Sequence, residues 1–318
     1  MLALIQIGWW HWTLFIAAIL AFLALDLGVF HRHAHAVRFK EALSWTVVWF
    51  LLAMGFAWFL GRPSVRGREE ALEFVTGYII ELSLSMDNVF VMALIFSFFR
   101  VPTRLQHRVL FWGIMGALIL RGIMIGAGAA LVTRFEWVLY LFGVFLVYSG
   151  IKILFSKEEG VHPEHNLIIR VARRFLPVAT DFDGQRFLTQ LNGRTAWTPL
   201  ALVLVMVETT DLVFALDSIP AIFAVTQKPF IVFTSNVFAI LGLRSLYFVL
   251  AGAIEYFRYL KYGLSLVLMF IGAKMLLPKS VPIPTTVSLV IVVGIIVAAM
   301  GVSVVVGWWE RRTERSKS

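Results

Sequence analysis

The chain has 318 residues, of which 60% are hydrophobic and only 15% are charged. Soluble domains carry about 25% charged residues, so this composition predicts a polytopic membrane protein. The absence of cysteine excludes disulfides, thiolate metal sites and cysteine nucleophiles. The net charge of +9 is spread over short loops and a C-terminal tail, which favours membrane orientation over nucleic-acid binding as its cause.

Apolar runs of about 17–25 residues are long enough to cross a bilayer as helices. The fold class that we predict is therefore all-α, with nine transmembrane helices. The first helix lacks the basic start and the small-residue cleavage site of a signal peptide. The predicted spans are residues 10–30, 43–60, 71–99, 107–132, 136–155, 197–226, 230–256, 260–277 and 285–309.

Lysine and arginine gather in alternate loops, and this asymmetry predicts the orientation. The long polar connection at 156–196 and the C-terminal tail lie on the basic side, together with the loops near residues 32–40 and 100–108. Cytoplasmic loops carry an excess of Lys and Arg. We therefore expect a cytoplasmic C-terminus and an N-terminus outside the cytoplasm. The loop at 61–70 departs from the rule, because its three arginines fall on the other side.

Two acidic segments, at residues 81–90 and 208–220, begin units that repeat each other. Asp87 precedes Arg121 by 34 residues, and Asp211 precedes Arg244 by 33. A Gly-x-Lys sequence then follows each arginine at a matching distance. Each unit has three helices, so two units joined by one cytoplasmic loop must be inverted relative to each other, as in secondary transporters. The predicted organisation is two N-terminal helices (1–70), a first repeat unit (71–155), a cytoplasmic loop (156–196), a second repeat unit (197–280), and a C-terminal helix with a basic tail (281–318).

The acidic segments predict a cation site, because each carboxylate inside a membrane costs roughly 2.5–3.5 kcal/mol. Glu81 and Asn88 share one helix face while Asp87 points elsewhere, and Glu208 shares a face with Asp211. We expect Pro220 to kink its helix beside the last aspartate. Oxygen ligands without thiolate suit hard divalent cations such as Mn²⁺, Ca²⁺ or Mg²⁺. The predicted metal ligands are Glu81, Asp87, Asn88, Glu208, Asp211 and Asp217.

Arg121 and Arg244 need counter-charges inside a membrane. In one interpretation they are charge-compensating residues that pair with Asp87 or Asp211 when the metal leaves. In the other they form static ion pairs that hold helices together.

Several segments resemble those of the TerC/Alx family of integral membrane proteins. The resemblance covers about residues 10–305 and is carried by Ser85-Met-Asp-Asn-Val-Phe-Val91, Asp217-Ser-Ile-Pro220 and Thr234-Ser-Asn-Val-Phe238. It implies a nine-helix protein of the bacterial inner membrane, a role in Mn²⁺ export, and a link to tellurium-resistance gene clusters. It also implies that Glu81, Asp87, Glu208, Asp211 and Asp217 are the family's intramembrane acidic positions.

The leading hypothesis is a divalent-cation exporter that carries Mn²⁺, with Ca²⁺, Mg²⁺ or Fe²⁺ as alternatives, by proton antiport. We expect no catalytic residues, no prosthetic group and no nucleic-acid partner, only the ion and the lipid bilayer; protein partners are not predicted. One alternative is a membrane scaffold in a stress-resistance or protein-insertion complex. The other is an intramembrane aspartyl hydrolase, in which two aspartates share a proton. The extra carboxylates and the lack of a Gly-x-Gly-Asp segment argue against the hydrolase.

Overall fold

A computed structural model describes residues 8–25, 39–63, 65–155, 177–191, 193–251, 260–278 and 283–315. In this part of the chain the structure confirms an all-α membrane protein with nine helices. Seven of them are long and apolar enough to cross a membrane, while α1 and α9 have 17 residues each. The helices are α1 (Trp9–Leu25), α2 (Phe39–Leu60), α3 (Arg68–Phe98), α4 (Thr103–Arg134), α5 (Val138–Phe155), α7 (Pro199–Phe223), α8 (Pro229–Ala251), α9 (Leu260–Leu276) and α10 (Thr285–Arg315).

Charged and proline-containing turns of three helices are not reported by the hydropathy pattern. α3 begins at Arg68, ahead of its apolar run, with Glu69 and Glu70 in its first turn. Negative side chains at a helix N-terminus interact favourably with its dipole, so this charged turn is helical although it is not apolar. α10 continues to Arg315, through most of the predicted basic tail. Pro220 does not interrupt α7, which runs on to Phe223 with the proline in its last turn.

The long polar connection contains a small β-hairpin, β1 (Leu188–Leu191) paired antiparallel with β2 (Arg194–Trp197). Gly193 has a φ of 75° in the turn between the strands, a conformation that glycine adopts without strain. α7 starts directly after β2. The Thr198 side chain accepts a hydrogen bond from the Ala201 backbone N–H, and Pro199 occupies the first helical position. Both are common at helix N-termini.

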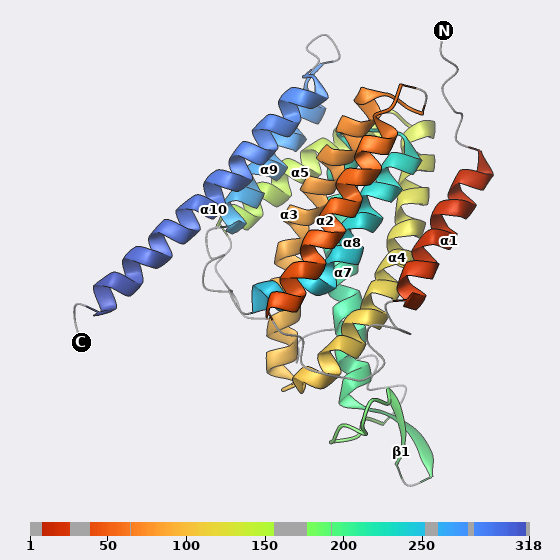
Figure 1. The fold of residues 1–318 in the computed structure, drawn as a ribbon, viewed down its shortest axis with the longest axis vertical. Helices are drawn as coiled ribbons and strands as arrows, with labels where there is room; N and C mark the ends of the chain where they lie inside the picture. Colours follow the sequence, from red (N-terminus) through yellow and green to blue (C-terminus); the bar gives the residue numbers. More distant parts are fainter. Residues whose placement is uncertain are drawn as a thin grey trace.

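Equivalent helices of the two repeat units run in opposite directions (Figure 1). α3, α4 and α5 correspond to α7, α8 and α9 in the sequence repeat, and each helix packs against its counterpart. α3 also packs against α8, and α4 against α7, so the four helices form one bundle core. α2 covers α3 and α8, and α10 covers α9 and α3.

Two glycines that the repeat aligns make the same contact at the α5–α9 crossing. A Cβ atom added to Gly150 would lie 2.8 Å from the Ser265 carbonyl oxygen. One added to Gly272 would lie 2.7 Å from the carbonyl oxygen of Gly143. Small residues let backbones approach closely inside membranes. The equivalence of the two contacts agrees with an inverted repeat.

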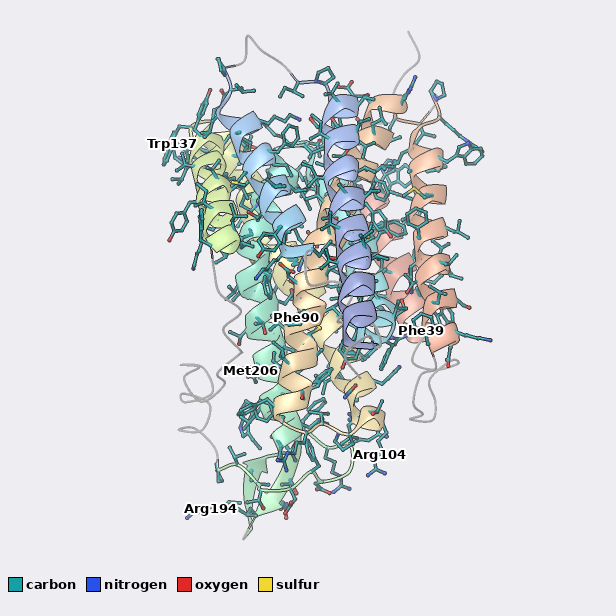
Figure 2. The ribbon with its side chains drawn as sticks, turned by 90° about the vertical axis from the view of Figure 1, so that its left-hand side faces the viewer. Phe39, Phe90, Arg104, Trp137, Arg194 and Met206 are labelled. Atoms are coloured by element: carbon teal, nitrogen blue, oxygen red, sulfur yellow. The ribbon has the colours of Figure 1, made fainter. Side chains whose placement is uncertain are left out.

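The two ends of the bundle carry different side chains. We call the end with β1 and β2 the hairpin end, and the end with the α2–α3, α4–α5 and α7–α8 turns the turn end. Figure 2 shows Arg104 and Arg194 at the hairpin end and Trp137 at the turn end. Phe90 lies between the ends on α3 and is 41% exposed, as expected for a lipid-facing side chain.

Candidate cation site

A buried arginine joins the two repeat units near the centre of the bundle. Arg121 of α4 is 1% exposed. Its Nη2 lies 2.8 Å from Asp211 Oδ1, and its Nε lies 3.1 Å from Asp211 Oδ2. Its Nη1 pairs with the Glu81 carboxylate. The guanidinium is thus held by one carboxylate from α3 and one from α7, which are equivalent helices of the two units.

Neutral groups complete the surroundings of the guanidinium. Arg121 Nη1 lies 3.4 Å from Ser218 Oγ and 3.5 Å from Asn236 Oδ1. Asn88 Nδ2 donates to Asp211 Oδ1 at 3.1 Å. Glu81 and Asn88 therefore point to the same place, as their spacing predicts. The charges are buried, and a buried charge is tolerated when it is paired and hydrogen-bonded.

Several polar atoms around Arg121 have no hydrogen-bond partner among the described residues. Two are acceptor oxygens, Glu81 Oε2 and Asn88 Oδ1, and a third is the amide nitrogen Asn236 Nδ2. Buried polar groups are normally satisfied, because each unmade hydrogen bond is unfavourable. The two oxygens are groups that a proton, a metal ion or water would satisfy.

A cavity of about 190 Å³ reaches Arg121 from the side of α5 and α9. Lys152 and Leu264 line it about one turn from the C-terminus of α5 and the N-terminus of α9, so the cavity lies beside Arg121 where these two short helices end. Asp87 and Asp217 also line it. Ser149 Oγ donates to Asp217 Oδ1 at 2.5 Å. The cavity is a carboxylate-lined route to the buried pair.

Glu208 and Arg244 lie apart from that cavity. A Cβ atom added to Gly116 of α4 would overlap the Glu208 carboxylate, so Glu208 occupies the space that this glycine leaves. Glu208 Oε2 has no hydrogen-bond partner among the described residues. Arg244 and Asp211 line a second, much smaller cavity of about 10 Å³.

The six predicted ligands therefore fall into three places. Glu81, Asn88 and Asp211 surround Arg121, Asp87 and Asp217 line the cavity, and Glu208 lies against α4. Within the described ranges, no three His, Asp or Glu side chains converge closely enough to hold a metal. The sequence predicted Asp87 or Asp211 as the partners of the arginines. In the structure Arg121 pairs with Asp211.

Three side chains of this region were not predicted as site residues from the sequence: Ser149, Lys152 and Asn236. Each is a polar residue inside an apolar helix, which is the available signal in the sequence. Lys152 was expected only from the Gly-x-Lys repeat, yet its side chain lines the cavity. Nothing in the spacing of Asn236 indicates that it meets Arg121.

Comparisons with known proteins agree with this architecture. Residues 66–315 match the family described as "Integral membrane protein TerC family". The chain is 53% identical over 294 residues to "Uncharacterized membrane protein STKORF319" of Myxococcus xanthus, which covers 92% of each chain. It is 46% identical over 293 residues to "Putative membrane-bound redox modulator Alx" of Escherichia coli strain K12, covering 90% of this chain and 91% of that protein. No solved structure matches. The chain belongs to the TerC family of integral membrane proteins.

Proposed function

We propose that the protein exports a divalent metal cation, Mn²⁺ in the first place, through the site around Arg121. The observation that carries this proposal is the pairing of one buried guanidinium with carboxylates from both repeat units, at a cavity lined by two further aspartates. Transporters with inverted repeats bind their substrates at the interface between the repeats, near the middle of the membrane.

Arg121 acts in this proposal as a resident cation that holds the place of the transported ion. Carboxylates as deeply buried as Glu81 and Asp211, at 0% and 3% exposure, require a positive partner. A metal ion that arrives along Asp87 and Asp217 displaces the guanidinium and takes Glu81, Asp211 and the amide oxygen of Asn88 as ligands. When the ion leaves, Arg121 returns, so the carboxylates are paired in both states.

The charges of the pair favour proton antiport. Two carboxylates and one guanidinium leave one negative charge in excess when both carboxylates are ionised. One proton neutralises that excess. A divalent ion adds two positive charges and releases this proton, so the displaced guanidinium takes Asp87 or Asp217 of the cavity lining as its counter-charge. The site takes up protons again when the ion leaves.

The chemistry of the ligands indicates a hard divalent cation. The family resemblance indicates which of these cations is transported. Carboxylate and amide oxygens suit Mn²⁺, Mg²⁺ and Ca²⁺. The resemblance to manganese exporters places Mn²⁺ ahead of Mg²⁺, Ca²⁺ and Fe²⁺. The relatives named Alx are named as redox modulators. This chain has no cysteine, so its own side chains supply no thiol–disulfide chemistry for such a role.

We place the protein in the bacterial cytoplasmic membrane with the hairpin end and the C-terminus inside. Basic residues gather in the loops of that end, which is the pattern of cytoplasmic loops. In this orientation an exporter takes its ion from the hairpin end.

Manganese efflux from proteoliposomes or from a manganese-sensitive null strain tests the proposal. Asp211→Asn and Asp217→Asn should abolish efflux. Asp183→Asn is the matched control, because the Asp183 side chain is 43% exposed and lies outside the helices. Full Mn²⁺ export by Asp211→Asn would refute the site. Absence of Mn²⁺ movement in the wild-type protein would refute export and favour the scaffold hypothesis, and equal export with and without a pH gradient would refute antiport.

A further inference from the structure

One face of α3 leads from the buried arginine site to the turn end of the bundle. Glu81, Gly77, Glu73 and Glu70 follow one another at spacings of four, four and three residues, so they share this face. With a rise of 1.5 Å per residue, Glu73 lies about 12 Å along the helix axis from Glu81. This face meets α7, α8 and the turn between them.

The first layer on this face is closely packed. A Cβ atom added to Gly77 would lie 2.9 Å from Ser235 Oγ and 3.5 Å from a methyl group of Ile222. Ser235 and Ile222 are both 0% exposed, and Ser235 Oγ bonds to the Val232 carbonyl of its own helix. The two helices are therefore in direct contact at this level, with no space for a further side-chain atom between them.

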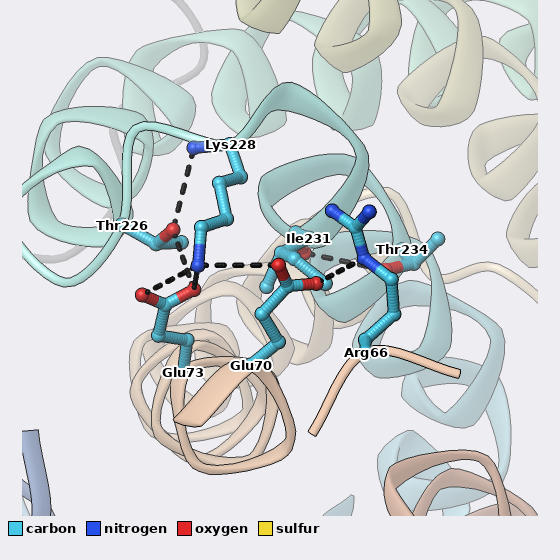
Figure 3. A network of polar contacts seen from close by, with 7 residues as sticks. All are labelled: Arg66, Glu70, Glu73, Thr226, Lys228, Ile231 and Thr234. Carbon is cyan, nitrogen blue, oxygen red and sulfur yellow. Dashed lines mark hydrogen bonds and ion pairs between the residues drawn. The ribbon is translucent and has the colours of Figure 1, made fainter. Parts of the chain in front are cut away.

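The second layer is a network of ion pairs around Lys228 in the α7–α8 turn (Figure 3). Lys228 Nζ lies 3.1 Å from Glu73 Oε2 and 3.3 Å from Glu70 Oε1. Thr226 Oγ1 donates to Glu73 Oε2 at 2.9 Å, and Arg66 pairs with Glu70. The Lys228 side chain is 40% exposed whereas the two glutamates are about one-tenth exposed. Lys228 therefore lies on the outer side of this layer, and the two glutamates lie beneath it.

We propose that these two layers form the gate that closes the site toward the turn end, with Lys228 as its latch. The inference rests on the proposed transport function, because only a transported ion needs an exit at this end. On α3 the residues that line the cavity begin at Glu81 and end at Asn88, so the cavity does not reach Gly77 or Glu73. The exit opens when the N-terminal half of α3 separates from the α7–α8 turn, which breaks the Lys228 pairs and parts Gly77 from Ser235. Water then solvates the separated charges of Lys228, Glu73 and Glu70.

The natural absence of cysteine makes a direct test available. Ser235→Cys places one thiol directly beneath the latch. Its labelling by a membrane-impermeant maleimide is measured from each side of the membrane, in the otherwise wild-type chain and together with Lys228→Met. Arg134→Cys, an exposed position at the turn end, is the positive control for labelling from that side.

We expect Ser235→Cys to stay protected in the wild-type background. Lys228→Met should raise its labelling rate at least several-fold from the turn end only, while Lys228→Arg and the charge exchange Glu73→Lys with Lys228→Glu keep it protected. Lys274→Met, which removes a lysine from the last turn of α9 at the same end, should leave it protected.

Unchanged labelling in Lys228→Met would overturn the gate. Labelling that rises equally from both sides would also overturn it, because general unfolding rather than one-sided opening would be the cause. The labelling does not depend on any transported ion. If the wild-type protein moves no Mn²⁺, the proposed function fails while the labelling result still decides whether this gate exists.

Discussion

Replacement of Arg121 by methionine is the sharpest test of the buried pair. Methionine fills much of the same volume but removes the positive charge, so Glu81 and Asp211 remain buried at 0% and 3% exposure without it. Removing one partner of a buried ion pair costs about 3–5 kcal/mol. At about 2–4 °C per kcal/mol, the melting temperature should fall by roughly 6–20 °C.

A divalent cation should reverse much of this loss. If Mn²⁺ takes the place of the guanidinium, a concentration of 100 times Kd stabilises the folded variant by about 2.7 kcal/mol. The wild-type protein should gain less, because the ion must first displace Arg121. Thermal unfolding in detergent, with and without Mn²⁺, measures both effects.

Two controls distinguish the loss of the Arg121 charge from a general loss of stability. Arg134→Met removes an exposed arginine from the end of the same helix and should change stability by less than about 0.5 kcal/mol. Adding Glu81→Gln and Asp211→Asn to Arg121→Met removes the unpaired charges, which should restore part of the stability and abolish the Mn²⁺ response. A variant Arg121→Met that melts like the wild type, or that ignores Mn²⁺, would refute the resident-cation argument.

Three further predictions follow from the contacts of single residues. Gly272→Ala should destabilise the α5–α9 crossing by about 1–3 kcal/mol because its Cβ overlaps backbone atoms, whereas Gly294→Ala, with nothing within 4 Å, should not; equal melting temperatures would contradict the close packing. Gly116→Ala should displace the Glu208 carboxylate and reduce Mn²⁺ efflux with little loss of stability, while Gly126→Ala in the same helix leaves both unchanged; undiminished efflux would show that the position of Glu208 does not matter. Burial opposes the charged form of Lys228, but hydrogen bonds and attraction from Glu73 and Glu70 outweigh it and raise the pKa of Lys228. Its contribution to stability is therefore complete below about pH 10.4 and is lost as the pH rises through the higher folded value; thermal unfolding from about pH 9 to 11 should show a smaller loss in Lys228→Met than in the wild type, and parallel curves would contradict this.

The helices and their order were predictable because bilayer thickness imposes a minimum apolar length on each span. α7 and α8 lie within a few residues of the expected ranges, and the spacing of Asp87, Arg121, Asp211 and Arg244 revealed the repeat. The start of α3 was not predicted, because hydropathy does not report a helical first turn that carries charged residues.

The acidic residues were recognisable from the sequence alone because a carboxylate inside an apolar run is costly wherever it points. Helical periodicity also placed Glu81 and Asn88 on one face, which depends only on their spacing. Their partners could not be read in this way. Arg121 meets Asp211 across 90 residues and Asn236 across 115, and the direction of such contacts depends on how α4 packs between α7 and α8.

The sequence by itself therefore determined that this is a helical, multi-span membrane protein with carboxylates in two matching segments. Only the tertiary structure decided that Arg121 lies between two of those carboxylates, that Asp87 and Asp217 line a cavity beside it, and that Glu208 lies apart against Gly116. The physical reason is that apolar length and helical periodicity are properties of one helix. Contacts between helices depend on how the whole bundle packs.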